Sequence, residues 1–324
     1  MQVNNATYPD LFMALKGGSN NFGIVTRFDF TTFEQGDLWA GQVYYPASSA
    51  TQQFQALYEF VEASSAVYDP RGDAQVILAY VITGTTTLFA NSRFLPMLIN
   101  VIFVNLTAPA FSYTLPEEYP AILRNLTDIQ PQFDNTLRIT SLADITMQIE
   151  SGTPNGSRYL FGTATFGNDA DFFEELKNMS DTEFAPLVHA YVSGLLVSVV
   201  LQPLTAPMLV AGCGKNSLGL CPDAGNLIIL DLTIQWNSAS DDDLVNSAAQ
   251  RFVDCAIARA QARGISNRYI YLNYALESQD PIGSYGQDNL NSMRATSLKY
   301  DPRQVFQRLV PGGFKLCRER GDKE

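Results

Sequence analysis

Residues 10–26 read DLFMALKGGSNNFGIVT. The pattern predicts a short helix that ends at Gly17 and Gly18, followed by a polar turn. Apolar and polar side chains then alternate, which predicts a half-buried strand over residues 24–30. Closely spaced glycines let backbone amides approach an anion, but the dinucleotide-binding fingerprint requires a strand before the helix, and here the helix comes first. From spacing alone, an ordinary helix end is favoured over an anion-binding loop.

Outward from this segment, helices and strands alternate without the regular cadence of a parallel, doubly wound sheet. Strands are expected over residues 38–45, 76–83, 159–165, 190–201 and 227–236. Helices are expected over residues 52–67, 117–125, 142–149, 172–177, 240–263 and 289–299. This order indicates an α+β fold, in which helices cover a large, mostly antiparallel sheet.

A second distinctive segment, residues 268–274, reads RYIYLNY. As a strand it would place Tyr269, Tyr271 and Asn273 on one face and Tyr274 on the other. Two phenols and a carboxamide on one face suit a pocket wall that hydrogen-bonds a ligand, and a tyrosine can act as a general base. Composition alone favours the alternative, in which the tyrosines are half-buried packing residues with their hydroxyls at the surface.

Composition excludes several classes of function. Hydrophobic residues make up 46% of the 324 and charged residues 17%, so the chain can bury a large core and is not disordered. A net charge of −12 argues against binding nucleic acid or an anionic membrane through a basic face. The single histidine, His189, excludes a His-rich metal site, so no metal centre is expected. Its neighbours 184–188 are mostly apolar, which favours a structural histidine over a hydrolase nucleophile–base pair.

The four cysteines are too scattered for a disulfide framework or a metal knuckle. Cys213 and Cys221 flank a short loop, which leaves a small disulfide hairpin and two free thiols as open alternatives. Cys255 falls within an amphipathic helical pattern and is expected to be a buried, small apolar side chain.

Five N-glycosylation triplets favour a secreted protein; they begin at Asn5, Asn105, Asn125, Asn155 and Asn178. The first residues nevertheless lack the basic and apolar regions of a signal peptide. The most apolar run, residues 94–104, is too short to span a bilayer. No membrane partner is therefore expected.

Taken together, the two ends of the chain are similar to fungal FAD-linked oxidases, which have a PCMH-type flavin domain and a berberine-bridge-enzyme-like C-terminus. Residues 10–26 closely resemble the DLFWALKGGGNNFGIVT segment of that family, with Ser19 in place of its third glycine. The far end resembles the family's YxNYA … YG … NL … KYDPxxVF tail, in the segments 271–275, 285–286, 289–290 and 299–306.

The resemblance implies a domain organisation. Residues 1–35 correspond to the C-terminal piece of the FAD-binding domain, 36–268 to the substrate domain and 269–317 to the tail that returns to the FAD domain. Residues 318–324 are then expected to be a disordered tail. The segment 91–104 fits the family's substrate sheet poorly.

The resemblance also implies site residues. Those expected to touch FAD through main-chain atoms are Gly17, Gly18, Asn21, Phe22, Gly23, Ile24 and Val25. Asn273 corresponds to the tail asparagine beside the isoalloxazine, Tyr271 is the first candidate for the catalytic base and Tyr274 the second. In such enzymes a hydride passes from a small alcohol, amine or sugar to the flavin, and molecular oxygen is the acceptor, often in secondary metabolism. Aromatic strand residues Tyr44, Tyr45 and Tyr80 make a flat substrate plausible.

The resemblance covers only the C-terminal two-thirds of such an enzyme. The pyrophosphate loop and the flavin-linking His and Cys of the family have no counterpart in this sequence, so covalent attachment is not expected here. Two interpretations remain open: a truncated flavin oxidoreductase, expected to be a monomer, or a non-catalytic remnant. In either case, residues 1–35 and 269–317 are expected to expose apolar surface.

Overall fold

The computed structural model of the chain describes residues 1–63, 65, 68–83, 104–151 and 155–316. The segment 91–104 lies outside these residues except for Val104, and so does the expected tail 318–324. Contacts along the chain define two compact units. Unit 1 contains Met1–Phe33, Ala206–Gly225 and Arg268–Glu324, and unit 2 contains Glu34–Thr205 and Asn226–Asn267. The sequence alone gave residues 206–225 to the substrate domain, whereas their contacts place them in unit 1.

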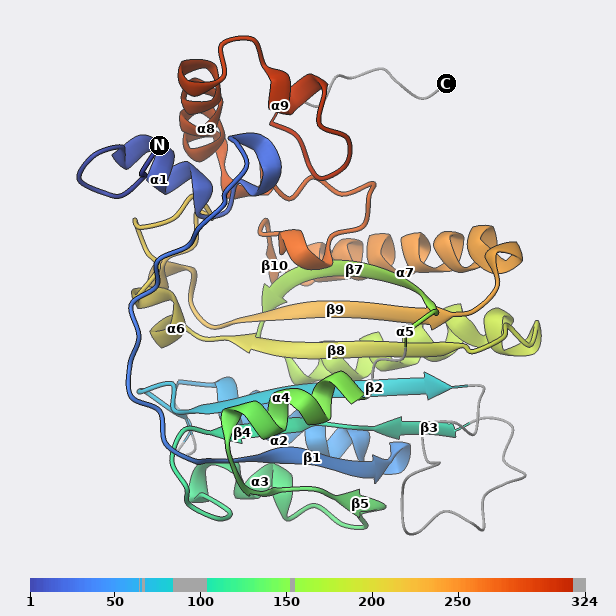
Figure 1. Ribbon diagram of the computed structural model, residues 1–324. Helices are drawn as coiled ribbons and strands as arrows, with labels where there is room; N and C mark the ends of the chain where they lie inside the picture. Colours follow the sequence, from blue (N-terminus) through green and yellow to red (C-terminus); the bar gives the residue numbers. More distant parts are fainter. Residues whose placement is uncertain (64, 66–67, 84–103, 152–154, 317–324) are drawn as a thin grey trace. The chain divides into compact units, whose positions relative to one another are not determined.

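Unit 2 is built on an antiparallel sheet, with ten strands among the described residues (Figure 1). The strand order is β10-β7-β9-β8-β2-β3-β1-β4, and β5 and β6 pair with β1. The strands are β1 (Leu38–Pro46), β2 (Ala74–Thr83), β3 (Val104–Thr107), β4 (Ala110–Tyr113), β5 (Asp134–Asn135), β6 (Arg138–Thr140), β7 (Arg158–Gly167), β8 (Leu196–Leu204), β9 (Leu227–Trp236) and β10 (Ser266–Asn267). This sheet, with its covering helices, confirms the predicted α+β fold.

One face of the sheet is covered by helices α2 (Ala50–Val61), α5 (Ala170–His189) and α7 (Asp242–Ala262) (Figure 1). Ile228 of β9 pairs with Phe166 of β7, and the Phe166 ring lies 4.8 Å from that of Phe172 in α5. Every second residue of β9, from Ile228 to Trp236, is buried on this face. Alternate side chains of a strand point to opposite faces, so the apolar pattern of β9 determines which face the helices cover.

The opposite face of the sheet is more polar. It carries Thr163, Asp231 and Val200, which are aligned across β7, β9 and β8 and therefore share a face. Helix α4 (Leu142–Ser151) packs against strand β1 through Ile145, which contacts Leu38 and Ala40.

Several elements differ from the sequence expectations. The helix expected over 117–125 is reduced to α3 (Arg124–Thr127) and a preceding 3-10 turn, because Pro120 disfavours a helical conformation at Tyr119, whose φ is 50°. The strand expected to begin at residue 190 begins at Leu196, because α5 continues to His189.

The two strands expected at the chain ends are also absent. Residues 24–30 form no strand, and the 268–274 segment has β10 before it and a 3-10 turn, Leu272–Tyr274, at its end. Alternation of side chains predicted these strands, but a strand also needs a neighbouring strand to pair with, and none of the described strands pairs with either segment.

Unit 1 joins segments that are far apart in the sequence. Helix α1 (Pro9–Leu15) is held to α8 (Gln287–Tyr300) by Asp10, which accepts hydrogen bonds from Lys299 Nζ at 2.7 Å and from the Tyr300 hydroxyl at 2.9 Å. The hydrogen bond from Lys299 is the main reason that the pKa of Asp10 is lowered to about 2. The remaining helices are α6 (Ala206–Val210) and α9 (Val305–Arg308).

The structure decides the two expectations that concern Cys213, Cys221 and Cys255. Cys213 and Cys221 form a disulfide, with a Cα–Cα distance of 4.7 Å. The expectation that Cys255 is buried is wrong, because its side chain is exposed. The buried stripe of α7 includes Phe252, Val253 and Ala256, and Cys255 lies beside it rather than within it.

Candidate functional site

The glycine turn, residues 16–18, follows directly after α1 in unit 1. Gly17 has a φ of 120°, and a Cβ atom there would lie 2.8 Å from Leu218 Cδ2. A Cβ atom at Gly18 would collide with the Phe22 ring and the Ala14 carbonyl oxygen. Gly17 is therefore required by its positive φ, and Gly18, whose φ is −88°, by its close approach to the Ala14 carbonyl oxygen.

Asn21 fixes the residues that follow the glycine turn. Its fully buried amide donates to the carbonyl oxygens of Gly18 at 2.9 Å and Phe314 at 2.8 Å. Its side-chain oxygen accepts from Gln307 Nε2 at 3.0 Å. Both amide hydrogens are thus used inside unit 1, so the Asn21 side chain has none left for a ligand, and any ligand contact by this residue would be through its main chain.

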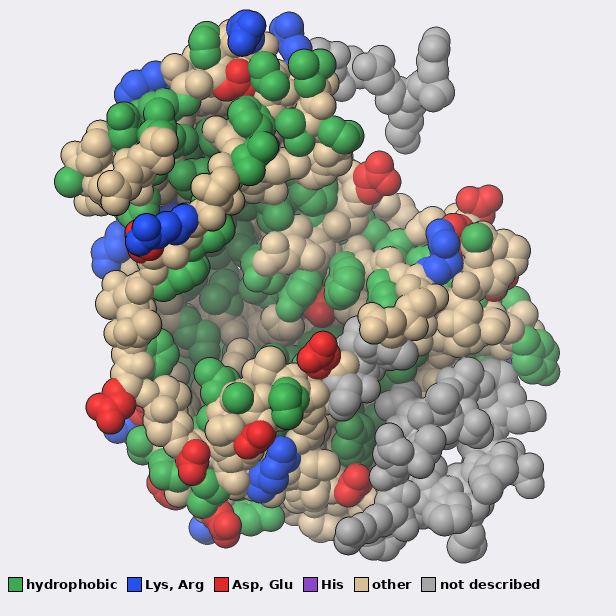
Figure 2. Space-filling model, viewed as in Figure 1, with side chains coloured by type: hydrophobic (Ala, Val, Ile, Leu, Met, Phe, Trp, Pro, Cys, Tyr) green, Lys and Arg blue, Asp and Glu red, His purple; other side chains and the backbone are tan. Residues whose placement is uncertain are grey.

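The open strip, residues 23–33, contrasts with this buried turn. Gly23 has a φ of 154° and open space where a Cβ would be, while Phe22 is buried. Ile24 is 84% exposed, Phe30 79% and Phe33 83%, and Val25 is also exposed. No backbone hydrogen bond is recorded for these residues within the described chain. The expectation of exposed apolar surface at the chain ends is confirmed here, and hydrophobic side chains also reach the surface of unit 1 around α8 and α9 (Figure 2).

A stack of tyrosines lies next to the glycine turn. The Tyr285 hydroxyl donates to the Gly17 carbonyl oxygen at 3.1 Å, and its ring stacks on Tyr269 with centroids 6.2 Å apart. Tyr269 stacks on Tyr271 at 6.5 Å, and the Tyr271 ring meets the edge of Tyr274 at 4.8 Å. Burial raises the pKa of both Tyr269 and Tyr285, so these two phenols stay protonated at neutral pH and act as packing groups.

At the outer end of the stack, Tyr271 and Asn273 come together, although not through a strand face. The Asn273 amide donates to the Tyr271 phenol oxygen at 2.8 Å. Because the phenol oxygen is the acceptor in this bond, a proton on that oxygen points away from Asn273. Asn273 is exposed, while Tyr271 and Tyr274 are half-buried, so a ligand can reach this group.

Sequence reasoning missed Asp231 in unit 2. Its side chain is buried on the sheet face opposite the helices, and desolvation raises its pKa to about 7. The Thr233 hydroxyl lies 3.2 Å from one of its carboxylate oxygens, and no Lys or Arg among the described residues forms an ion pair with it. Asp231 is paired with Thr163 of β7, and Thr165 lies two residues further along that strand. The buried Thr165 hydroxyl has no hydrogen-bond partner within the described chain. The signal in the sequence is one carboxylate inside the apolar run LIILDLTI, at residues 227–234.

His189 contributes nothing to either group of residues. It is the exposed last residue of α5. Burial and orientation by a neighbouring group are what a histidine needs to act as a general base, so the hydrolase alternative gains no support.

The fit of a flavin can be tested on unit 1. A planar, largely apolar ring system requires an accessible main chain and apolar side chains, and the open strip offers unpaired backbone groups beside Ile24 and Val25. The Tyr271–Asn273 pair adds a polar group that a ligand can reach. These residues fit the ring portion of FAD.

No protein-family model matches the chain, but curated relatives do. The FAD-dependent monooxygenase drtC of Aspergillus calidoustus is 34% identical over 322 residues, covering 98% of this chain and 57% of the relative. The FAD-dependent monooxygenase FUP4 of Fusarium proliferatum is 32% identical, covering 97% and 59%. The oligopeptidase PhomG' of Diaporthe leptostromiformis is 32% identical, covering 95% of this chain and 24% of that longer protein. The chain thus spans less than two-thirds of the length of these relatives.

Solved structures share the fold. The 6-hydroxy-D-nicotine oxidase of Arthrobacter nicotinovorans aligns with a TM-score of 0.63 at 16% identity, covering 95% of this chain and 62% of that one. The xylooligosaccharide oxidase of Myceliophthora thermophila gives 0.63 at 16%, covering 94% and 61%. Berberine bridge enzyme gives 0.58 at 11%, covering 92% and 59%. These neighbours and relatives confirm the resemblance to FAD-linked oxidases.

None of the described helices is long and apolar enough to cross a membrane.

Proposed function

Because this chain is related to fungal FAD-dependent monooxygenases and has the fold of berberine-bridge-type oxidases, we propose that it functions in an FAD-dependent oxidoreductase of secondary metabolism. The substrate is a small alcohol, amine or sugar, and molecular oxygen is the final electron acceptor. The observation that carries the proposal is the assembly of unit 1: the two end segments, nearly 300 residues apart, meet through Asn21, Gln307 and Phe314. This assembly leaves the open strip accessible beside the fixed glycine turn.

The roles of the individual residues follow from their contacts. The main chain of the glycine turn, Asn21, Phe22 and the first residues of the open strip, Gly23 to Val25, would hold FAD. FAD, when bound, supplies a two-electron acceptor. As a phenolate, Tyr271 would accept the proton of the substrate hydroxyl or amine, with its oxygen oriented by the Asn273 amide. Tyr274 supports the Tyr271 ring and is the second candidate for the base.

Asp231 and Thr165 form a second polar group, on the sheet of unit 2. A protonated carboxyl can donate a hydrogen bond and an ionised one can accept it, and the unpartnered Thr165 hydroxyl can do either. Burial strengthens such bonds, since water does not compete for them. Both residues are buried, so they mark a polar position inside the sheet of unit 2.

The alternative function is a non-catalytic remnant. The exposed apolar strip favours it, because such a strip need not bind a cofactor. Titration of the purified chain with FAD distinguishes the two. The flavin absorbance near about 450 nm should shift and saturate if the chain binds FAD. Absence of saturation would leave the remnant as the function of this chain alone.

If FAD binds, Tyr271→Phe tests the base. With a panel of alcohols, amines and sugars, the variant should reduce bound flavin about 10²–10⁴-fold more slowly than the parent, while FAD affinity is unchanged. An undiminished rate would exclude Tyr271, and Tyr274→Phe would then be measured in the same way.

A secreted, glycosylated protein remains part of the proposal, and the structure favours two of the five triplets. Asn5 and Asn155 lie in exposed turns. At Asn178 the required hydroxyl, of Ser180, is fully buried and donates to the Lys177 carbonyl oxygen. A glycan is bulky and solvated, which suits the turns. After expression in a secreting fungal host, Asn155→Gln should remove one glycan by mass spectrometry and Asn178→Gln none; the reverse result would contradict this assignment.

A further inference from the structure

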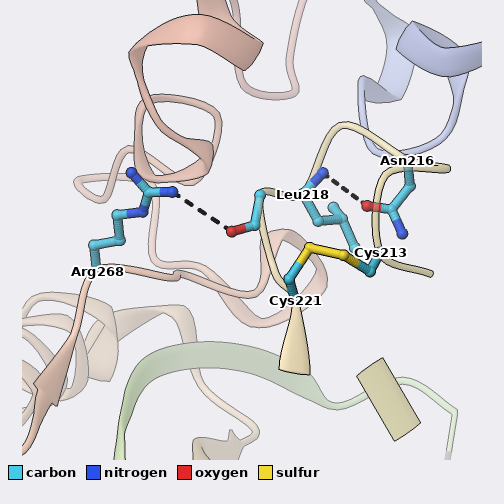
Figure 3. The surroundings of a disulfide bond; sticks show 6 residues. Cys213, Asn216, Leu218, Cys221 and Arg268 are labelled. Atoms are coloured by element: carbon cyan, nitrogen blue, oxygen red, sulfur yellow. Dashed lines mark hydrogen bonds between the residues drawn. A yellow bond between two sulfur atoms is a disulfide. The ribbon is translucent and has the colours of Figure 1, made fainter. Parts of the chain in front are cut away.

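The clasp, residues 213–221, is the loop closed by the Cys213–Cys221 disulfide (Figure 3). In the sequence it lies between strands β8 and β9 of unit 2, yet its contacts belong to unit 1. The connection between the adjacent antiparallel strands β8 and β9 is far longer than a hairpin turn requires. The extra residues therefore serve contacts outside the sheet.

The clasp completes the hydrogen bonding at the C-terminal end of α1. The Ser217 amide donates to the Lys16 carbonyl oxygen at 3.0 Å, and the Ser217 hydroxyl donates to the Met13 carbonyl oxygen at 3.0 Å. Carbonyl groups at a helix end lack the partner that the next turn would supply. The Lys16 carbonyl gains a donor from the clasp, and the Met13 carbonyl, which also accepts from the Lys16 amide at 3.1 Å, gains a second one. Ser217 is buried, so these two bonds are protected from water.

The clasp also contacts the glycine turn and the tyrosine stack directly. Leu218 packs against Gly17, and its own conformation is fixed by a bond from its amide to Asn216 Oδ1 at 3.0 Å. Gly219, with a φ of 70°, lies so close to the Tyr285 carbonyl oxygen that no Cβ would fit. Arg268 Nη2 lies 3.5 Å from the carbonyl oxygen of Gly219 and 3.5 Å from that of Tyr285.

These contacts form a closed arrangement, since Tyr285 in turn donates to Gly17. The disulfide reduces the number of conformations that the clasp can adopt, and so it keeps Ser217 and Leu218 in place. Without it, a loop with glycines at 214 and 219 would lose much of that restraint.

We propose that Ser217 and Leu218 are positioning residues for the glycine turn, and that the Cys213–Cys221 disulfide is a redox switch that controls whether this turn is held in its binding conformation. The part that concerns flavin rests on the proposed function; the part that concerns the turn does not. Reduction by a dithiol breaks the S–S bond, and two electrons and two protons pass to the two sulfur atoms while the dithiol becomes a disulfide.

Amide hydrogen exchange on the full chain tests the proposal. Treatment with dithiothreitol, verified by a gain of two thiols, should accelerate exchange at Lys16 and Ser217 by about tenfold or more, while the amides of β9 remain protected. The double variant Cys213→Ser/Cys221→Ser should behave like the reduced protein. Cys255→Ser, which removes the exposed free thiol, is the matched control and should behave like the oxidised parent. Unchanged exchange at Lys16 and Ser217 after reduction would overturn the proposal.

The role of the clasp residues can be tested with the disulfide intact. Ser217→Ala removes the bond to Met13 and Leu218→Ala removes the contact with Gly17, so both should accelerate exchange at Lys16 and leave unit 2 protected. FAD titration of oxidised and reduced protein is the second measurement, with weaker binding expected after reduction and recovery after reoxidation. If the oxidised chain binds no FAD, the proposed function of the chain alone fails, and the exchange result still decides the role of the clasp. Equal FAD affinity in both redox states would overturn the redox switch.

Discussion

Unit 2 and unit 1 are stabilised in different ways. In unit 2, strands pair over nine or ten residues, and a complete apolar face is buried under three helices. In unit 1, three distant segments are joined by single polar contacts such as those of Asn21, Asp10 and Ser217. The comparison teaches that loss of one apolar side chain should weaken unit 2 as a whole, whereas loss of one polar side chain should release a local part of unit 1.

The largest expected effect is in unit 2. Leu232→Ala removes a fully buried side chain from the centre of β9 and should lower the free energy of unfolding by about 2–5 kcal/mol. Urea denaturation followed by circular dichroism measures it. Leu298→Ala, at an exposed position of α8, is the control and should change stability little. Equal losses in the two variants would show that β9 does not form the stable core.

The next effect is in unit 1. Asn21→Ala leaves the carbonyl oxygens of Gly18 and Phe314 without their donor, which should cost about 1–3 kcal/mol. Hydrogen exchange should show this loss as faster exchange in unit 1 alone. Asn20→Ala is the matched control, because the neighbouring side chain is only half-buried and makes two longer hydrogen bonds, to the Gly312 carbonyl oxygen at 3.3 Å and from Lys315 Nζ at 3.2 Å. Faster exchange throughout unit 2 would contradict the separation of the two units.

A smaller effect concerns pH. The pKa of Asp231 in the folded protein is about 7, above its ordinary value of 3.8, so folding favours the neutral form. The contribution of Asp231 to the free energy of unfolding is therefore fully present below about pH 4 and is lost as the pH rises through about 7. Asp231→Asn should remove this dependence and raise stability at pH 8 by about 1–2 kcal/mol, measured by denaturant midpoints at several pH values. Asp254→Asn, at an exposed position of α7, should leave the pH profile unchanged; an unchanged profile in Asp231→Asn would contradict the assignment.

The smallest effect tests the glycine turn. Ser19 has a φ of 52°, a left-handed conformation that costs other residues free energy and glycine almost none. Ser19→Gly should therefore stabilise unit 1 by about 0.5–1 kcal/mol, net of the entropy that glycine loses on folding. Hydrogen exchange at Lys16 and Asn21 should slow. Faster exchange would show that the Ser19 side chain makes a compensating contact.

The comparison also explains which expectations from the sequence succeeded. Strand β9 has the bounds that its apolar pattern predicted, because it is buried between two other long strands, and a pattern that reports burial is then sufficient. The strand expected over 24–30 has the same kind of pattern and does not form. Pattern reports which side chains can be buried, and it contains no information on whether a partner strand is present.

The candidate site shows the same limit. The motif residues Gly17, Tyr271 and Asn273 were identifiable from resemblance, since each lies in a short contiguous segment. The contacts that position them were not, because Tyr285, Ser217 and Leu218 come from other segments of the chain. Asp231 was overlooked because a carboxylate in an apolar strand is informative only once its burial is known.

The sequence by itself determined the α+β class, the single-histidine chemistry and the resemblance to FAD-linked oxidases, since these depend on composition, periodicity and local motifs. Tertiary structure alone decided that the Cys213–Cys221 loop supports the glycine turn and that the Asn21 side chain is used in internal hydrogen bonds. The physical reason is that these properties arise from contacts between residues about 200 to 300 positions apart, and the free energy of such contacts depends on chain closure, which local pattern does not encode.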